Sequence, residues 1–355
     1  MCGLAGYLSK QNTQVSPDVL LSKMADCIAH RGPDDFGVWH DSKAGIGLAH
    51  RRLSVVDLSS AGHQPMHAAR GRYVMVFNGE IYNYSKLRSE LEASNHSLNW
   101  NGNSDTETIL AGFEEWGVEA TIQRIIGMFA IALWDKQTNT LTLARDRIGE
   151  KPLYYGWQGD TFLFGSELKA MKSHPDFKAE IDRNSLCLFM RHCYIPAPYS
   201  IYQGIAKLMP GCVLRISLEQ REPNIKAYWS GVDAATQGKA DQFKGSAGEA
   251  ITTLESLLKD AVGQQMMADV PLGAFLSGGV DSSTVVALMQ AQSSRPVKTF
   301  SIGFHDDLYN EAEHAKAVAR HLGTDHTELY ITPEDSMAAI HSLPTLYDEP
   351  FADSS

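Results

Sequence analysis

The stretch VPLGAFLSGGVDSSTVV, residues 270–286, decides the fold of the second half of the chain. It begins as an apolar run typical of a buried strand and ends with apolar residues at helical spacing. Between them, SGGVDSS at 277–283 has the glycines that a tight turn from strand to helix favours. Backbone N–H groups and the helix dipole at such a turn favour a bound phosphate. The stretch therefore predicts an α/β domain that binds a nucleotide.

The composition of this loop also predicts how it would hold the nucleotide. Its glycines let a ligand approach the backbone closely, and its serines add hydroxyl donors. Asp281 would repel phosphate unless a divalent cation lies between them, so its presence indicates Mg²⁺. No lysine follows the glycines, which excludes the GxxxxGK[ST] signature; a glycine-rich turn without a ligand is the alternative. The expected nucleotide contacts here are Ser277, Gly278, Gly279, Asp281, Ser282 and Ser283, with Asp281 also the metal ligand.

Helices and strands alternate regularly from about residue 247 onward. The helix pattern at 249–266 precedes the first strand, and strand patterns recur at 297–304 and 326–332. This alternation predicts a doubly wound parallel sheet. Because such sheets usually have more strands than these, we expect the second domain to be incomplete.

The first 200 residues instead combine short strands with segregated helices, which predicts an α+β layered domain. Helices are expected to begin at Ser16-Pro17 and at Ser104, where SDTE matches a capping box. The segment GVDAATQGKADQFKGSAGEA at 231–250 is polar, rich in glycine and alanine and without an apolar period, which indicates a linker. The expected divisions are 1–210 for the first domain, 211–246 for a connecting strand and linker, and 247–355 for the second domain.

Composition limits the class of protein. The net charge of −11 argues against a nucleic-acid-binding surface, and neither a membrane span nor a secretory signal is predicted. The cysteine count is odd and no CxxC spacing occurs, which disfavours disulfides and zinc and favours the cytoplasm. Cys27 shares a helical face with Leu20, Met24 and Ile28, so we expect it in the core.

The N-terminal sequence MCGLAGY leaves two readings of Cys2 open. The residue could be a small apolar filler at the start of a strand. Alternatively, removal of Met1 would make Cys2 the N-terminus, with a thiol that is a strong nucleophile when ionised. A free α-amino group titrates near ~7.7–8.0, so it could serve as the base for that thiol.

Further motifs stand in a fixed order along the whole chain. They are HRGPDD (30–35), HRRLSVVDL (50–58), HQPM (63–66), FNGEIYN (77–83), SDTE (104–107), ARDRIGEKPLYY (144–155), SGGVDSS (277–283) and YDEPFADSS (347–355). In this order they resemble the glutamine-hydrolysing asparagine synthetases. The resemblance implies a class II glutamine amidotransferase domain, a four-layer αββα Ntn-hydrolase sandwich. A PP-loop ATP pyrophosphatase domain follows it.

The resemblance also implies roles for single residues. Cys2 would be the nucleophile, Asn78 and Gly79 the oxyanion donors, and Arg52 the partner of the glutamine α-carboxylate. Residues expected to complete the glutamine and nucleotide sites are Leu53, Glu80 and Asp105 for glutamine, and Leu276 and Ile302 for adenine or ribose. Each has a structural alternative: a surface cation for Arg52, a turn for Asn78-Gly79, a favourable helix start for Asp105. ARDRIGEKPLYY, with Asp146 and Arg147, is expected to build the core and the domain junction, and EPFADSS to border an acceptor pocket.

The function implied is a two-stage ligation that uses ATP and Mg²⁺. Glutamine would be hydrolysed at Cys2, and the ammonia would travel to aspartate activated as β-aspartyl-AMP. Other acceptors, such as a sugar uronate, and a non-catalytic scaffold are the alternatives. The partners expected are glutamine, aspartate and ATP, and a homodimer is left open. Because the family continues beyond EPFADSS, we expect these 355 residues to retain only the glutaminase half.

Overall fold

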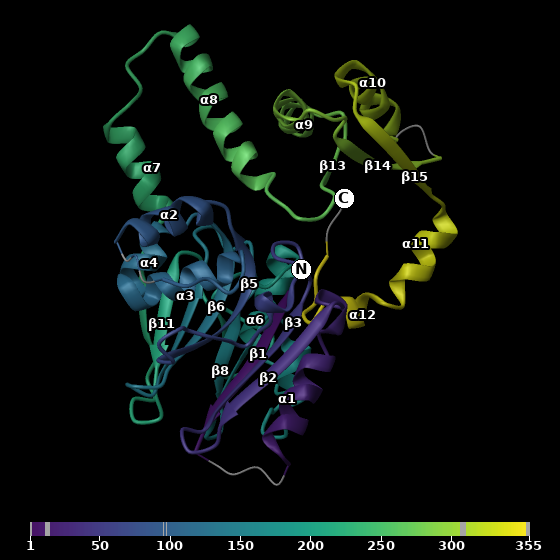
Figure 1. The fold of residues 1–355 in the computed structure, drawn as a ribbon. Helices are drawn as coiled ribbons and strands as arrows, with labels where there is room; N and C mark the ends of the chain where they lie inside the picture. The colour runs from purple at the N-terminus through teal and green to yellow at the C-terminus, as the bar shows by residue number, and fades with distance from the viewer. Residues whose placement is uncertain (1, 11–14, 95, 97, 306–309, 353–355) are drawn as a thin grey trace. The chain divides into compact units, whose positions relative to one another are not determined.

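The computed structural model describes residues 2–10, 15–94, 96, 98–305 and 310–352. The chain forms two compact units (Figure 1). Unit 1 comprises Met1–Ala240 with Tyr347–Ser355, and unit 2 comprises Asp241–Leu346.

Two antiparallel sheets, each of six strands in the described residues, form the centre of unit 1. In spatial order the first contains β10 (Ile205–Lys207), β8 (Tyr154–Gln158), β9 (Thr161–Gly165), β1 (Gly3–Ser9), β3 (Ile46–Arg52) and β2 (Asp35–Asp41). The second contains β12 (Asn224–Ala227), β11 (Cys212–Ile216), β7 (Thr140–Arg145), β6 (Gly127–Asp135), β5 (Tyr73–Ile81) and β4 (Met66–His67).

Alternating side chains bury both faces of each sheet. Leu4 and Leu8 of β1 pack into the core between the sheets, whereas Ala5 and Tyr7 pack into a second core on the outer face. Strand β5 alternates in the same way between the inter-sheet core and a third core. Because strand side chains point to opposite faces in turn, this pattern builds four layers. The αββα class implied by the resemblance is confirmed.

Helices form the outer layers of unit 1, as Figure 1 shows for α1 beside β1 and β2. They are α1 (Pro17–Asp26), α2 (Tyr84–Ser94), α3 (Asp105–Glu115), α4 (Val118–Arg124), α5 (Leu168–Lys172) and α6 (Arg183–His192). Ser104 caps α3 by accepting from the Glu107 N–H at 3.1 Å. The expected capping box is only half formed, because the Glu107 carboxylate accepts from the Asn101 and Gly102 N–H groups instead. Cys27 was expected in the core; it is only partly buried and packs against the core that contains Leu20, Met24 and Ile28.

The segment predicted as a linker is more ordered than its composition indicates. Strands β11 and β12 pair inside the second sheet, so residue 210 falls between two strands of unit 1. Helix α7 (Gly231–Ala240) follows, and none of its residues is buried. A helix without a buried face has no apolar period, which is why the sequence pattern did not reveal it.

Unit 2 has the predicted parallel arrangement. Its described sheet contains β13 (Gly273–Phe275), β14 (Lys298–Phe304) and β15 (Asp325–Ile331), all parallel. Its helices are α8 (Ala247–Gln265), α9 (Val280–Gln292), α10 (Ala312–Leu322), α11 (Pro333–Ile340) and α12 (Leu343–Leu346). No described helix of either unit combines the length and the apolar character that crossing a bilayer requires.

The sheet of unit 2 has one packed face and one exposed face among the described residues. Leu276, which follows β13, lies in a small core with Val286, Ala315 and Ala319. Side chains of β14 alternate between buried and exposed, and Ile302 is 48% exposed. The Leu276 side chain is therefore part of the core, whereas Ile302 lies on the open face.

This difference predicts opposite effects of two substitutions on unit 2. Leu276→Ala should lower its free energy of unfolding by about 2–5 kcal/mol, because the substitution leaves a cavity in a packed core. Ile302→Ala should change it by no more than about 0.5 kcal/mol, as exposed positions usually do. Urea unfolding followed by circular dichroism measures both, and equal losses would contradict the placement of Leu276.

Candidate functional site

The site of unit 1 lies where β5 extends beyond its short neighbour β4. Strand β4 pairs with Val74 and Met75 of β5, and no described strand pairs the rest of that edge of β5. Phe77 N–H donates instead to Gln64 Oε1 at 2.6 Å, and Ile81 N–H donates to Asp105 Oδ2 at 3.0 Å. N–H groups on one edge of a strand come from alternate residues. The Gly79 N–H therefore lies on the same edge, between two occupied neighbours.

Asn78 adds an amide without partners next to that N–H. The residue is only 1% exposed, and among the described residues neither its Nδ2 nor its Oδ1 has a hydrogen-bond partner. A buried polar group left unpaired costs about 1–3 kcal/mol. Gly79 is required by space, because a Cβ there would lie 2.2 Å from Met128 O. Asn78 and Gly79 thus present donors that the fold itself does not use.

The Cys2 thiol lies at the start of β1 and is held by the residue that follows β3. Leu53 N–H donates to Cys2 Sγ at 3.3 Å, and Sγ lies 3.5 Å from Leu53 O. Arg31 Nε donates to Cys2 O at 2.9 Å and so fixes the backbone. Burial raises the pKa of the Cys2 thiol, while the Leu53 N–H and the Arg52 charge act to lower it. An N–H aimed at sulfur stabilises the thiolate.

Arg52 is buried, which excludes the surface-cation alternative. Its guanidinium donates to Ser59 O at 3.0 Å and to Asp57 O. Gly62 makes room for it, because a Cβ there would lie 1.9 Å from Arg52 Nη2. The surrounding loop therefore fixes the direction of this cation.

Two carboxylates complete the site, both with raised pKa values. Burial raises the pKa of Asp105 to about 6, although the Ile81 and Thr106 N–H groups oppose the shift. Burial likewise raises the pKa of Glu80, and Lys151 opposes it. Between pH 3.8 and about 6 the folded chain retains an Asp105 proton that the unfolded chain releases, so stability falls as pH rises through this range. A bound cation would offset the cost of the ionised carboxylate.

All these side chains line one cavity of about 100 Å³. It brings together Cys2, Arg52, Leu53, Asn78, Gly79, Glu80 and Asp105, as the resemblance implied. Gln64 and Lys151 also line it but were not predicted to. Asp146 has the expected structural role, accepting from the N–H groups of Gly149, Glu150 and Lys151. The cavity contact of Lys151 was missed because its motif was assigned to the core.

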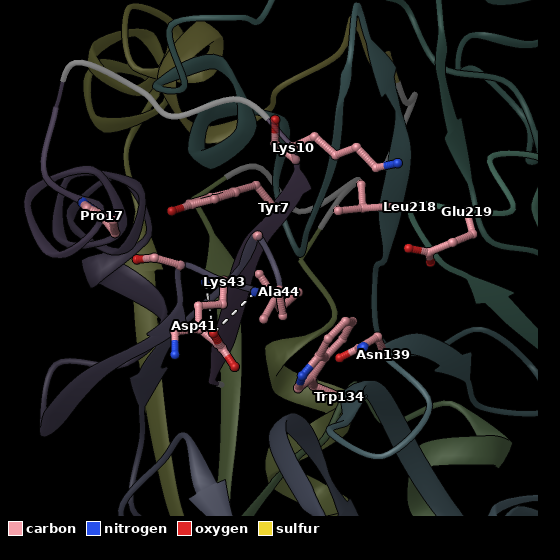
Figure 2. Close-up of a pocket in the computed structure, with 14 residues that line it drawn as sticks. Tyr7, Lys10, Pro17, Asp41, Lys43, Ala44, Trp134, Asn139, Leu218 and Glu219 are labelled. Atoms are coloured by element: carbon pink, nitrogen blue, oxygen red, sulfur yellow. Dashed lines mark hydrogen bonds between the residues drawn. The ribbon is translucent and has the colours of Figure 1, made fainter.

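Another cavity of unit 1 lies at the opposite ends of β1 and β3 (Figure 2). It has a volume of about 540 Å³ and is lined by Tyr7, Lys43 and Trp134, among others. None of the residues predicted for catalysis or substrate binding lines it. The smaller cavity is the better candidate because the predicted nucleophile Cys2, the predicted donors Asn78 and Gly79, and the charged side chains converge there.

In unit 2, the predicted phosphate loop has the form of an anion site. Gly278 has φ +81°, and a Cβ there would lie 2.8 Å from Ala315 N, so the tight turn requires glycine. Ser277 Oγ and Ser282 Oγ lie 2.9 Å apart. Ser283 Oγ is buried and has no partner among the described residues. An unused hydroxyl beside the N-terminus of α9 fits a phosphate.

The metal prediction has less support than the phosphate prediction. Asp281 lies in the first turn of α9, but the described residues contain no group of three or more His, Cys, Asp or Glu side chains able to hold a metal ion. Mg²⁺ at Asp281 would therefore need phosphate oxygens as further ligands. The backbone N–H of Leu276, a residue predicted to bind the nucleotide, is not free to do so, because it donates to Phe300 O at 2.9 Å.

The described part of YDEPFADSS, Tyr347–Ala352, belongs to unit 1. Glu349 accepts from Ile201 N–H at 2.8 Å and pairs with Lys207 at 2.5 Å. Asp348 pairs with Lys169 at 3.4 Å. The contacts of this segment are thus those of an anchor on unit 1; 353–355 lie outside the described residues.

Known proteins match the chain throughout. A family described as "Glutamine amidotransferase domain" matches residues 1–229, and one described as "Asparagine synthase" matches residues 253–355. A putative glutamine-hydrolysing asparagine synthetase 2 from Methanocaldococcus jannaschii is 36% identical over 372 residues, covering 99% of this chain and 69% of that protein. The chain belongs to the glutamine-hydrolysing asparagine synthetase family.

Two further matches describe the extent of the similarity. Asparagine synthetase 1 of Bacillus subtilis is 36% identical over 357 residues, covering 99% of this chain and 54% of that protein. The chain spans about half the length of several curated relatives that it matches. The solved structure of a glutamine phosphoribosylpyrophosphate amidotransferase from B. subtilis also matches. The alignment covers 99% of this chain and 94% of the amidotransferase chain, with 13% identity and a TM-score of 0.48.

Replacing Asn78, whose amide has no partner among the described residues, should raise the stability of the chain and lower its activity. Asn78→Leu should raise the free energy of unfolding by about 1 kcal/mol, because it removes a buried group without partners. Asn83 is the matched control: its amide donates to Arg124 O at 3.0 Å and accepts from Ile126 N–H at 2.8 Å. Asn83→Leu should therefore destabilise, by about 1–3 kcal/mol. Thermal unfolding of the two variants checks this; a loss for Asn78→Leu would show that its amide is paired.

Proposed function

We propose that unit 1 hydrolyses glutamine with Cys2 as the nucleophile. The observation that carries this proposal is that one cavity is lined by the partly buried Cys2 thiol, by the Asn78 amide, which has no partner among the described residues, and by Gly79, whose N–H lies on the edge of β5 beyond β4. The thiolate sulfur would attack the side-chain carbonyl carbon of glutamine. The oxygen of that carbonyl would become an oxyanion and accept hydrogen bonds from Asn78 and Gly79.

Proton transfer is assigned to the α-amine that Cys2 would carry after loss of Met1, which lies outside the described residues. The amine would take the thiol proton and pass it to the leaving NH₂ group as the C–N bond breaks. This releases ammonia and leaves a glutamyl thioester. Water, deprotonated by the same amine, would then cleave the C–S bond, giving glutamate and the free thiol.

The charges of the cavity suit the other end of the substrate. Arg52 would hold the α-carboxylate, and Asp105 and Glu80 would hold the α-ammonium. Leu53 would fix the thiol through its backbone. The zwitterionic end of glutamine thus matches the buried Arg52 and Asp105 and the partly buried Glu80.

For the whole protein we propose ATP-dependent amidation of aspartate to asparagine, in line with the names of its relatives. The loop of unit 2 would bind the pyrophosphate end of ATP through Ser277, Ser282 and Ser283. Mg²⁺ at Asp281 would neutralise phosphate charge. Aspartate activated as β-aspartyl-AMP would receive the ammonia. All five cysteines are free, which supports a reducing compartment such as the cytoplasm.

Cys2→Ala tests the nucleophile. The variant should lose glutamine hydrolysis by at least about a thousandfold, because no other group of the cavity can form the thioester. Binding of ATP by the same variant should stay unchanged. An ammonia-release assay and calorimetric nucleotide binding measure the two properties, and the intact mass shows whether Met1 is removed. Retained hydrolysis would overturn the assignment.

The raised pKa of Asp105 predicts a pH dependence of the KM for glutamine. Below about pH 6 its carboxyl becomes neutral and no longer attracts the α-ammonium, so KM should rise as pH falls through this value. Asp105→Asn should have a high KM that varies little between about pH 5 and 7. Initial rates over this range check both enzymes. An Asn variant with the wild-type pH profile would exclude Asp105 as the titrating group.

A further inference from the structure

Two buried side chains hold the backbone of Phe77 on the edge of β5 where strand pairing has ended. Gln64 Oε1 accepts from Phe77 N–H at 2.6 Å, and His50 Nε2 lies 2.9 Å from Phe77 O. The two side chains are 4% and 0% exposed, respectively. Together they replace both hydrogen bonds that a neighbouring strand would make with this residue. We call this pair the Phe77 clamp.

His50 can act in the clamp only as a donor. A carbonyl oxygen accepts but does not donate, so Nε2 carries the proton, and Nδ1 has no partner among the described residues. Burial lowers the pKa of His50 to about 4, with Arg52 and His63 acting in the same direction and Asp35 and the Phe77 carbonyl opposing it. The ring is therefore neutral near pH 7, with its one proton on the Nε2 that faces Phe77 O.

The clamp lies directly before the two oxyanion donors. Phe77 precedes Asn78, and the donors follow without an intervening turn because β5 continues to Ile81. The opposite edge of β5 is held by β6, where Asn78 pairs with Ala130 and Gly79 with Phe129. A strand fixed on both edges cannot slide or twist freely. The direction of the Asn78 amide and the Gly79 N–H is thus set by the groups that hold Phe77.

We propose that Gln64 and His50 are positioning residues for glutamine hydrolysis, acting through the backbone of Phe77 on Asn78 and Gly79. The proposal rests on the proposed function and gives the HQPM motif a role. A small misalignment of an oxyanion donor weakens transition-state binding more than substrate binding. Loss of the clamp should therefore lower kcat and leave KM nearly unchanged.

The first test removes one member of the clamp at a time. Gln64→Met and His50→Leu should each lower kcat for glutamine hydrolysis by about tenfold to a hundredfold, less than the loss of a donor itself. KM should stay within about threefold, since the ground-state contacts remain. His50→Gln, which keeps an N–H near the position of Nε2, should restore most of kcat.

A matched control separates positioning from a general loss of stability. Gln158 is also buried, and it accepts from Lys178 N–H at 2.8 Å and donates to Gln203 O at 2.9 Å. Gln158→Met should therefore destabilise the fold much as Gln64→Met does, but without the decrease in kcat. An equal decrease of kcat in both variants would overturn the proposal.

A double-mutant cycle with Asn78→Ala decides whether the clamp acts through the oxyanion donors. If it does, Gln64→Met should lower kcat by less than about threefold in the Asn78→Ala background, because the donor it positions is already gone. If Gln64→Met instead lowers kcat by the same factor with and without Asn78→Ala, the inference is overturned. If Asn78→Ala itself leaves kcat unchanged, the proposed function of the cavity fails instead, so the two failures are distinguishable.

Discussion

The short length of strand β4, which begins only at Met66, is the constraint on which the site of unit 1 depends. Because β4 is antiparallel to β5 and its Met66 pairs with Met75, no described strand pairs the N–H and carbonyl groups on that edge of β5 beyond Met75. Buried polar side chains pair the backbone groups of Phe77 and the N–H of Ile81 on this edge, and leave the Gly79 N–H between them open. Because backbone groups cannot remain unpaired inside a protein without cost, the interrupted sheet is itself the origin of a binding edge.

The cavity combines two features that lower stability at neutral pH. The Asn78 amide is buried without a partner among the described residues, and burial raises the pKa of Asp105 to about 6, so that ionising this carboxyl in the folded chain costs free energy. A zwitterionic amino acid with a side-chain carbonyl would relieve each of them. The fold tolerates these costs because three apolar cores hold the strands in place. One core lies between the two sheets, and one lies on the outer face of each sheet.

Much of this site could be predicted from sequence, because its residues stand in short motifs with a fixed order. The motifs that contain Gln64 and His50 predict no role for these two residues, and Lys151 lies in a motif predicted to build the core and the domain junction. Their functions depend on contacts across the fold, such as the hydrogen bonds from Phe77 to the side chains of two separate segments. Helix α7 and the core position of Leu276 were missed for a related reason, since neither has a local pattern that distinguishes it.

The sequence by itself determined the two-part organisation and the strand-to-helix turn at SGGVDSS, and it predicted which residues line the cavity proposed to bind glutamine. These depend on local spacing and residue chemistry, which the order of the chain records directly. Only the tertiary structure decided that β4 begins only at Met66, that Gln64 and His50 pair the backbone of Phe77 in its place, and that Tyr347–Ala352 anchors on unit 1. Those features come from pairing between distant segments, which is fixed by the packing of sheets and not by any one stretch of residues.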